Sequence, residues 1–166
     1  MNVIVDVREE MPRRAGAAPY PLRRLSQVDM AVVHWASAVV RDWTPGEIAA
    51  YQTGPVAHLD FPEIAYHFVV TWDGTVYQTL SLEKRAWHAG EWNTCSVGVL
   101  ACPAEGGLLS EAQVTSLRCL LCHLKGHFGR WLGVVGHSEV RPTDCPGPAW
   151  EQNKTRIVGA LWTHRR

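Results

Sequence analysis

The sequence lacks any long apolar run. No segment approaches the ~20 consecutive apolar residues that a helix needs to span a bilayer. The first residues, MNVIVDVREEMPRR, are acidic and interrupted where a secretory signal peptide would be basic and then apolar. We therefore expect synthesis in the cytoplasm without a signal peptide. If the protein acts outside the cell, another agent must release it.

The sequence also lacks a net charge. Its 16 basic and 16 acidic residues cancel, so the overall charge does not favour a nucleic acid as partner. A local excess occurs near the N-terminus, where no acidic residue separates Arg13, Arg14, Arg23 and Arg24. This excess predicts a contact with an anionic cell envelope, and a solvated leader explains it equally well.

A complete set of intramolecular disulfides is excluded because the number of cysteines is odd. In the cytoplasm, free thiols or metal ligands are more common than disulfides. The segment Cys119-Leu120-Leu121-Cys122-His123 fits the C-x-x-C-H pattern of haem attachment. It falls within the apolar stripe of an expected helix, so we interpret its thiols as small buried core groups instead. The five cysteines are Cys95, Cys102, Cys119, Cys122 and Cys145.

The length and the order of structural signals indicate one α/β domain. A chain of 166 residues is long enough for a single domain with its own core. Residues 1–27 contain three prolines and predict an irregular basic leader. Strand and helix signals alternate over residues 28–166, which predicts a central mixed β-sheet flanked by helices.

Local patterns place the expected elements. Thr44-Pro45-Gly46-Glu47 and Ser110-Glu111-Ala112-Gln113 are capping boxes, and each opens a helix. Asp73-Gly74 joins two runs rich in aromatic and β-branched residues, as in a hairpin. The expected strands are residues 31–35, 65–72, 75–80, 96–102 and 133–137. The expected helices run from 45 towards 52, from 111 to 128, and from about 150 to 162.

Three residues could share a metal ion. His137 and Cys145 flank a short proline-containing loop, and His34 ends another apolar strand. Imidazole and thiolate are both good zinc ligands, at about 2.0–2.3 Å, and three protein ligands with an open fourth position are typical of a catalytic zinc site. The alternative is that these are ordinary core or surface residues, because the chain has eight histidines and spacing alone selects no triple.

Several short blocks together point to a known family. The blocks are VVH at 32–34, YHF at 66–68, WHAG at 87–90 with Asn93, SVGV at 96–99, and GHSEV at 136–140 ending in DCPGP at 144–148. In this order they resemble the type 2 N-acetylmuramoyl-L-alanine amidases, a family that includes small phage endolysins and the peptidoglycan recognition proteins. The resemblance runs from about residue 28 to residue 150. It implies a mixed central sheet flanked by helices, with a zinc cleft at one face.

The resemblance also implies a ligand set and a mechanism. One zinc ion per chain would be held by His34, His137 and Cys145. Tyr66 matches a tyrosine that faces the reacting carbonyl, where its hydroxyl would stabilise the oxyanion. Many members carry a lysine at the position of Thr143, so this residue offers a neutral donor where a charge is usual.

Other positions correspond to the substrate cleft. His88 and Asn93 match residues that line the cleft for peptide and sugar. Trp35 either borders the sugar site or packs in the core. His67 neighbours Tyr66 on the opposite face of a strand, so we interpret it as structural. Glu139 is either a general base or, as we prefer, a solvated or helix-capping group.

The expected function is hydrolysis of the amide bond between N-acetylmuramic acid and L-alanine in peptidoglycan. The protein would be a monomeric phage or prophage endolysin that reaches the cell wall after release, with peptidoglycan as its partner. One alternative is a recognition module that binds peptidoglycan without cutting it. Such relatives usually lack the third ligand, so Cys145 favours the enzyme. Another alternative is a cytosolic amidase that recycles soluble anhydro-muropeptides.

Overall fold

A six-stranded sheet forms the centre of the molecule, with the strand order β1-β4-β3-β5-β2-β6. The computed structural model describes residues 4–36, 43–55, 59–102 and 105–162. Most neighbouring strands are parallel, and only β3 and β4 run antiparallel, which confirms the mixed sheet. The strands are β1 (Ile4–Asp6), β2 (Met30–Trp35), β3 (Phe68–Val70), β4 (Val76–Gln78), β5 (Ser96–Ala101) and β6 (Gly133–Gly136).

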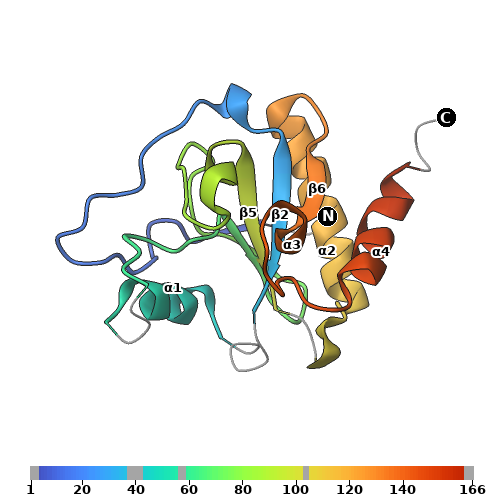
Figure 1. The fold of residues 1–166 in the computed structure, drawn as a ribbon, viewed down its shortest axis with the longest axis horizontal. Coiled ribbons are helices and arrows are strands. Elements are labelled where there is room, and N and C mark those ends of the chain that lie inside the picture. The colour runs from blue at the N-terminus through green and yellow to red at the C-terminus, as the bar shows by residue number, and fades with distance from the viewer. Residues whose placement is uncertain (1–3, 37–42, 56–58, 103–104, 163–166) are drawn as a thin grey trace.

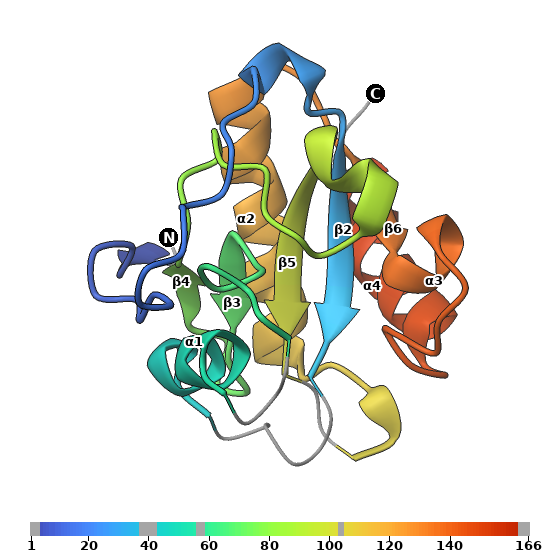
Figure 2. The same cartoon turned by 60° about the vertical axis from the view of Figure 1, so that its left-hand side comes forward.

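Helices cover both faces of this sheet (Figures 1 and 2). α2 and α4 pack on one face, and α1 packs on the other with the long irregular segments. None of the helices within the described residues is long and apolar enough to cross a membrane. The α-helices are α1 (Pro45–Thr53), α2 (Glu111–Phe128), α3 (His137–Val140) and α4 (Trp150–Trp162). The 3-10 turns are η1 (Leu25–Gln27), η3 (Gly90–Thr94) and η4 (Glu105–Gly107).

Local sequence explains where the two longer capped helices begin. The Thr44 hydroxyl accepts a hydrogen bond from the Glu47 N–H, and the Glu47 carboxylate accepts one from the Thr44 N–H. Ser110 and Gln113 exchange the same pair of bonds at the start of α2. Both predicted capping boxes are therefore confirmed.

The side chains of strand β2 alternate between the two faces of the sheet. Ala31 and Val33 face the apolar cluster that α2 and α4 cover. Because side chains alternate along a strand, Val32 and His34 face the opposite side. All four residues are buried, so His34 enters a desolvated environment on the face away from α2 and α4.

Two features differ from expectation. The described part of the leader is not merely irregular, because β1 extends the sheet by pairing with β4, and Tyr20 is buried. Cys119 and Cys122 are exposed, so their interpretation as buried core thiols is wrong. They occupy the solvent face of α2, whereas Leu117 and Leu121 lie on its buried face.

Candidate metal centre

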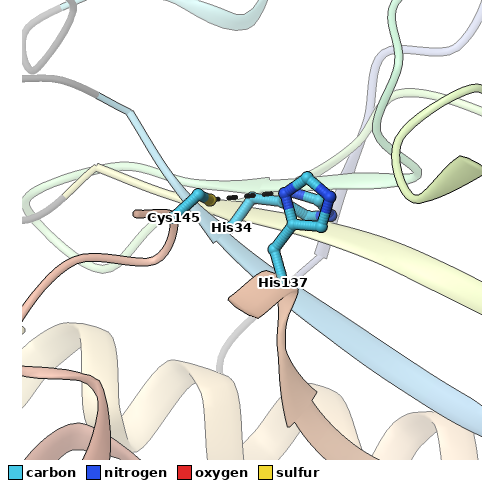
Figure 3. Close-up of side chains that lie close together, drawn as sticks. All are labelled: His34, His137 and Cys145. Atoms are coloured by element: carbon cyan, nitrogen blue, oxygen red, sulfur yellow. Dashed lines mark hydrogen bonds between the residues drawn. The ribbon is translucent and has the colours of Figure 1, made fainter. Parts of the chain in front are cut away.

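Three side chains of metal-ligating type converge beside the end of β2 (Figure 3). His34 lies in β2, His137 begins α3 directly after β6, and Cys145 lies in the loop before α4. β2 and β6 are parallel, and Val33 is paired with Gly136. His34 follows Val33 within β2, and His137 follows Gly136 as the first residue of α3. The strand register therefore brings the two imidazoles together.

The spacing of these side chains suits one small cation. The ring centroids of His34 and His137 are 4.4 Å apart, and Nδ1 of His34 lies 3.8 Å from Sγ of Cys145. One ligand atom from each residue lies within 4.8 Å of the other two. Ligands at about 2.0–2.3 Å from a tetrahedral zinc ion are about 3.3–3.8 Å apart, so a small contraction would complete the site. The structure thus groups the three predicted ligands.

The chemistry of the histidines also fits a zinc ion. Nε2 of His137 is buried and has no hydrogen-bond partner within the part of the chain that the structure describes. Burial lowers the pKa of His34 well below 6.5 and also lowers the pKa of His137. Both rings are therefore neutral at pH 7, and a neutral imidazole has a lone pair for a metal ion.

Cys145 is partly buried and anchored from β2. Burial raises the pKa of its thiol, and a hydrogen bond from the Trp35 N–H, 3.4 Å from Sγ, partly offsets this effect. Metal binding would displace the thiol proton, because the thiolate is the ligand. The residues present therefore fit zinc. The partial exposure of His137 and Cys145 leaves the centre accessible from solvent.

Glu139 fixes the start of α3 next to His137. One carboxylate oxygen accepts hydrogen bonds from the Gly136 N–H and from Nε1 of Trp150, both at 2.6 Å. The other oxygen accepts one from Lys154 at 2.5 Å. These contacts confirm the helix-capping interpretation, because both oxygens hold α3 against α4.

Trp35 packs instead of standing free. A Cβ atom added to Gly107 or Gly147 would lie 2.6 Å from its ring, so both backbones touch the indole. Both glycines also have positive φ, which other residues rarely adopt. Trp35 therefore packs against two loops, and its place at the border of the sugar site stays a prediction.

Tyr66 lies beside the ligands. Its ring centroid is 5.2 Å from that of His34, and the side chain is partly buried. Burial raises the pKa of its hydroxyl, the nearby Cys145 adds to this effect, and a hydrogen bond with Gln52 partly offsets it. Tyr66 therefore stays protonated at neutral pH and can donate a hydrogen bond.

His88 and Asn93, which are expected in the substrate cleft, make hydrogen bonds within the protein. His88 is buried beneath His34, with its Nδ1 3.0 Å from Nε2 of His34. The Oδ1 atom of Asn93 accepts hydrogen bonds from the backbone N–H groups of His88 and Ala89. Both ring nitrogens of His88 and Oδ1 of Asn93 therefore bind the protein itself. A contact of either residue with the substrate stays a prediction.

Thr143 is exposed near the third ligand. Its hydroxyl oxygen accepts a hydrogen bond from the Cys145 N–H at 3.3 Å. The hydroxyl proton is not used in that bond. A contribution of Thr143 to the reaction stays a prediction.

Not all arginines of the basic leader are free to contact an anionic envelope. Arg23 is buried, and its guanidinium donates to the carbonyl groups of Leu82, Asn93 and Ser96. Burial lowers its pKa to about 10. Arg23 therefore supports the loop that carries His88 and cannot contact a cell envelope.

Two other arginines of the leader have acidic partners. Nε of Arg13 lies 3.4 Å from the Glu63 carboxylate, and Arg14 lies 2.7 Å from Asp60. These acids come from a distant segment of the chain, so the local excess of positive charge in the sequence is partly neutralised in the fold. Arg24 is exposed, and its contact with an envelope stays a prediction.

Sequence reasoning missed several supporting residues. Ser96, Gly98 and Gln52 contact His88 or Tyr66, but they lie far from the ligands along the chain. Gly98 had one usable signal, since a glycine within a strand often marks a close approach by another group. The other two are ordinary residues whose roles depend on tertiary contacts.

Two cavities lie away from the metal centre. One, of about 490 Å³, is lined by Asp73, Glu111 and Ser116 among others. The second, of about 250 Å³, is lined by residues that include Trp43 and Tyr77. Neither cavity is lined by His34, His137 or Cys145.

Curated relatives at the sequence level include an amidase and a peptidoglycan recognition protein. The 1,6-anhydro-N-acetylmuramyl-L-alanine amidase AmpD of Salmonella typhimurium (strain SL1344) is 30% identical over 156 residues, which cover 82% of this chain and 83% of that protein. Peptidoglycan-recognition protein SC2 of Drosophila melanogaster is 27% identical over 132 residues, which cover 75% of this chain and 72% of that protein.

Solved structures share the fold. The Ph2119 endolysin of a Thermus scotoductus bacteriophage superposes with a TM-score of 0.72 at 24% identity, over 93% of this chain and 99% of that one. Peptidoglycan recognition protein LE, solved with tracheal cytotoxin, has a TM-score of 0.71 at 17% identity, over 99% of this chain and 95% of that one. The family model described as N-acetylmuramoyl-L-alanine amidase matches residues 24–148. Since this match covers more than half of the sequence, the chain belongs to the N-acetylmuramoyl-L-alanine amidase family.

Proposed function

We propose that this protein is a zinc-dependent hydrolase that cleaves the amide bond between N-acetylmuramic acid and L-alanine in peptidoglycan. The observation that supports it most is the convergence of His34, His137 and Cys145, with one imidazole nitrogen buried and unpaired among the described residues. These residues would hold one zinc ion per chain. Zinc in such a site supplies Lewis acidity and lowers the pKa of water to about 7.

The chain's own groups would assist the reaction in two ways. Tyr66 keeps its proton and lies beside His34, so its hydroxyl can donate to the oxyanion that develops on the amide carbonyl. Thr143 would be a second, weaker donor, since its oxygen accepts from Cys145 and its proton is available. Two neutral imidazoles and one thiolate would leave a net charge of about +1 on the centre, which favours the same oxyanion.

A recognition module is the second candidate, since the family relatives include peptidoglycan recognition proteins. The presence of Cys145 within the ligand group favours the hydrolase, because a complete set of three ligands is what a catalytic zinc site requires. Within the hydrolase class, we propose a phage or prophage endolysin rather than a recycling enzyme. Because the relatives include both AmpD and endolysins, the two substrates to compare are soluble anhydro-muropeptide and intact peptidoglycan.

The decisive experiment measures which bond is cut. The zinc-loaded protein should release new L-alanine amino termini from purified peptidoglycan, and chelation should abolish the release. Cys145→Ser should lose zinc and activity while still sedimenting with peptidoglycan. Tyr66→Phe should keep zinc and lose about 10²-fold in rate.

Other outcomes would contradict the proposal. Binding without release of amino termini, with zinc present, would identify a recognition module. Release of reducing sugar ends would identify a glycosidase. Faster cleavage of soluble anhydro-muropeptide than of intact sacculi would replace the endolysin by a recycling amidase.

Contact with the anionic envelope is a separate part of the proposal. Arg24 is exposed and, among the residues that the structure describes, has no acidic partner, unlike Arg13 and Arg14. Arg24→Gln should weaken binding to intact cells at low salt and leave cleavage of soluble fragments unchanged. Unchanged binding would remove this contact.

A further inference from the structure

A buried chain of hydrogen-bonding groups leads away from the metal centre. Nε2 of His34 lies 3.0 Å from Nδ1 of His88. Nε2 of His88 lies 3.3 Å from Oγ of Ser96, and that hydroxyl lies 2.6 Å from the carbonyl oxygen of Trp92. All three side chains are buried, so each polar atom depends on its neighbour in the chain.

Only one arrangement of protons satisfies these contacts with neutral rings. The Trp92 carbonyl can only accept, so the Ser96 hydroxyl must donate to it. Ser96 Oγ then accepts from His88, which places the His88 proton on Nε2 and leaves Nδ1 as an acceptor. His34 must consequently donate from its own Nε2. The lone pair of His34 is then on Nδ1, the nitrogen that faces Sγ of Cys145.

The position of His88 is restrained on several sides. Asn93 accepts hydrogen bonds from the N–H groups of His88 and Ala89, at 3.0 and 2.6 Å. A Cβ atom on Gly98 would lie 2.7 Å from the His88 ring, so the ring rests directly on β5. A flipped ring would place a carbon atom against His34. The acceptor is therefore held in one orientation.

We propose that His88 is a positioning residue of the metal centre, which holds His34 in the tautomer with a free Nδ1 and is itself oriented by Ser96. The inference rests on the zinc site of the proposed function. Partners of this kind fix the tautomer and orientation of a metal-binding imidazole, and their removal typically weakens metal binding about 10–100-fold. His88 thus acts through His34 and not on the substrate.

Two variants of nearly equal shape test the role of the acceptor. His88→Leu removes it, whereas His88→Asn can place a carbonyl oxygen near the position of Nδ1. Zinc affinity is measured by competition with a chromophoric chelator, with folding checked by circular dichroism. We expect His88→Leu to bind zinc about 10–100-fold more weakly and His88→Asn to recover most of that loss. Equal affinities in all three proteins, or equal losses in both variants, would overturn the proposal.

A second measurement uses the unmodified, zinc-loaded protein and needs no variant. Long-range ¹H–¹⁵N NMR should show a proton on Nε2 of His34 and on Nε2 of His88. It should also show a coupling across the hydrogen bond to Nδ1 of His88. A proton on Nδ1 of His88, or zinc on Nε2 of His34, would refute the inference.

Both readouts are independent of hydrolysis. A protein with these tautomers that binds zinc and frees no alanine amino termini contradicts the proposed activity, and the positioning role stands. A protein that cleaves the amide bond with the opposite tautomers contradicts the positioning role alone.

Discussion

The metal-free protein should already lose stability at pH values well above those at which carboxylates titrate. His34, His67 and His88 are buried, and burial is the main cause that lowers the pKa of each. The pKa of His88 falls to about 3. In the unfolded chain these groups would titrate near 6.5. Between the two values the unfolded state binds more protons than the folded state, so stability rises with pH up to about 6.5 and falls below it.

The size of the effect follows from the number of such groups. Each buried histidine that stays neutral in the folded state lowers the free energy of unfolding by about 1 kcal/mol as the pH falls from 6.5 to 5.5. Below pH 5.5, the decrease approaches about 1.4 kcal/mol per pH unit. Three histidines therefore remove about 3 kcal/mol over this interval. A typical domain has about 5–15 kcal/mol in total, so the change is large.

Urea denaturation of chelator-treated protein at pH 7.5, 6.5 and 5.5 measures this directly. His67→Gln should reduce the pH slope by about one third, because one of the three groups is removed. His123→Gln is the matched control on the exposed face of α2 and should leave the slope unchanged. A free energy of unfolding that is constant from pH 7.5 to 5.5 would refute the reasoning, as would an unchanged slope in His67→Gln.

Two substitutions probe the groups that support the ligands. Gly98→Ala should displace the His88 ring, since the new Cβ atom would lie 2.7 Å from it, and zinc affinity should fall about tenfold in a chelator competition. Gly126→Ala has open space on α2 and should instead stabilise the fold by about 0.5–1 kcal/mol in urea denaturation, with zinc affinity unchanged. Glu139→Ala should lower the free energy of unfolding by about 1–3 kcal/mol, because the buried Gly136 N–H loses its acceptor. Ordinary surface substitutions change this free energy by about ±0.5 kcal/mol, so a loss below about 0.5 kcal/mol would contradict the prediction.

The parts of the fold that depend on neighbouring residues were predictable. The capping boxes at Thr44 and Ser110 need only residues three positions apart, and both are present. Strand β1 was not predictable, because a three-residue strand has no periodicity and forms only where β4 offers a partner. The exposure of Cys119 and Cys122 was also missed, because apolar periodicity identified a helix without deciding which positions at its edge face solvent.

The candidate site divides in the same way. The sequence by itself determined the ligand types and their order, because His34 and His137 follow apolar strands and Cys145 follows a short loop. Tertiary structure alone decided which ring nitrogen faces the metal centre. His34 and His88 are 54 positions apart, and their hydrogen bond exists only because β5 leaves room for the His88 ring at Gly98. A tautomer depends on the position of a neighbouring atom, and a linear pattern carries no such position.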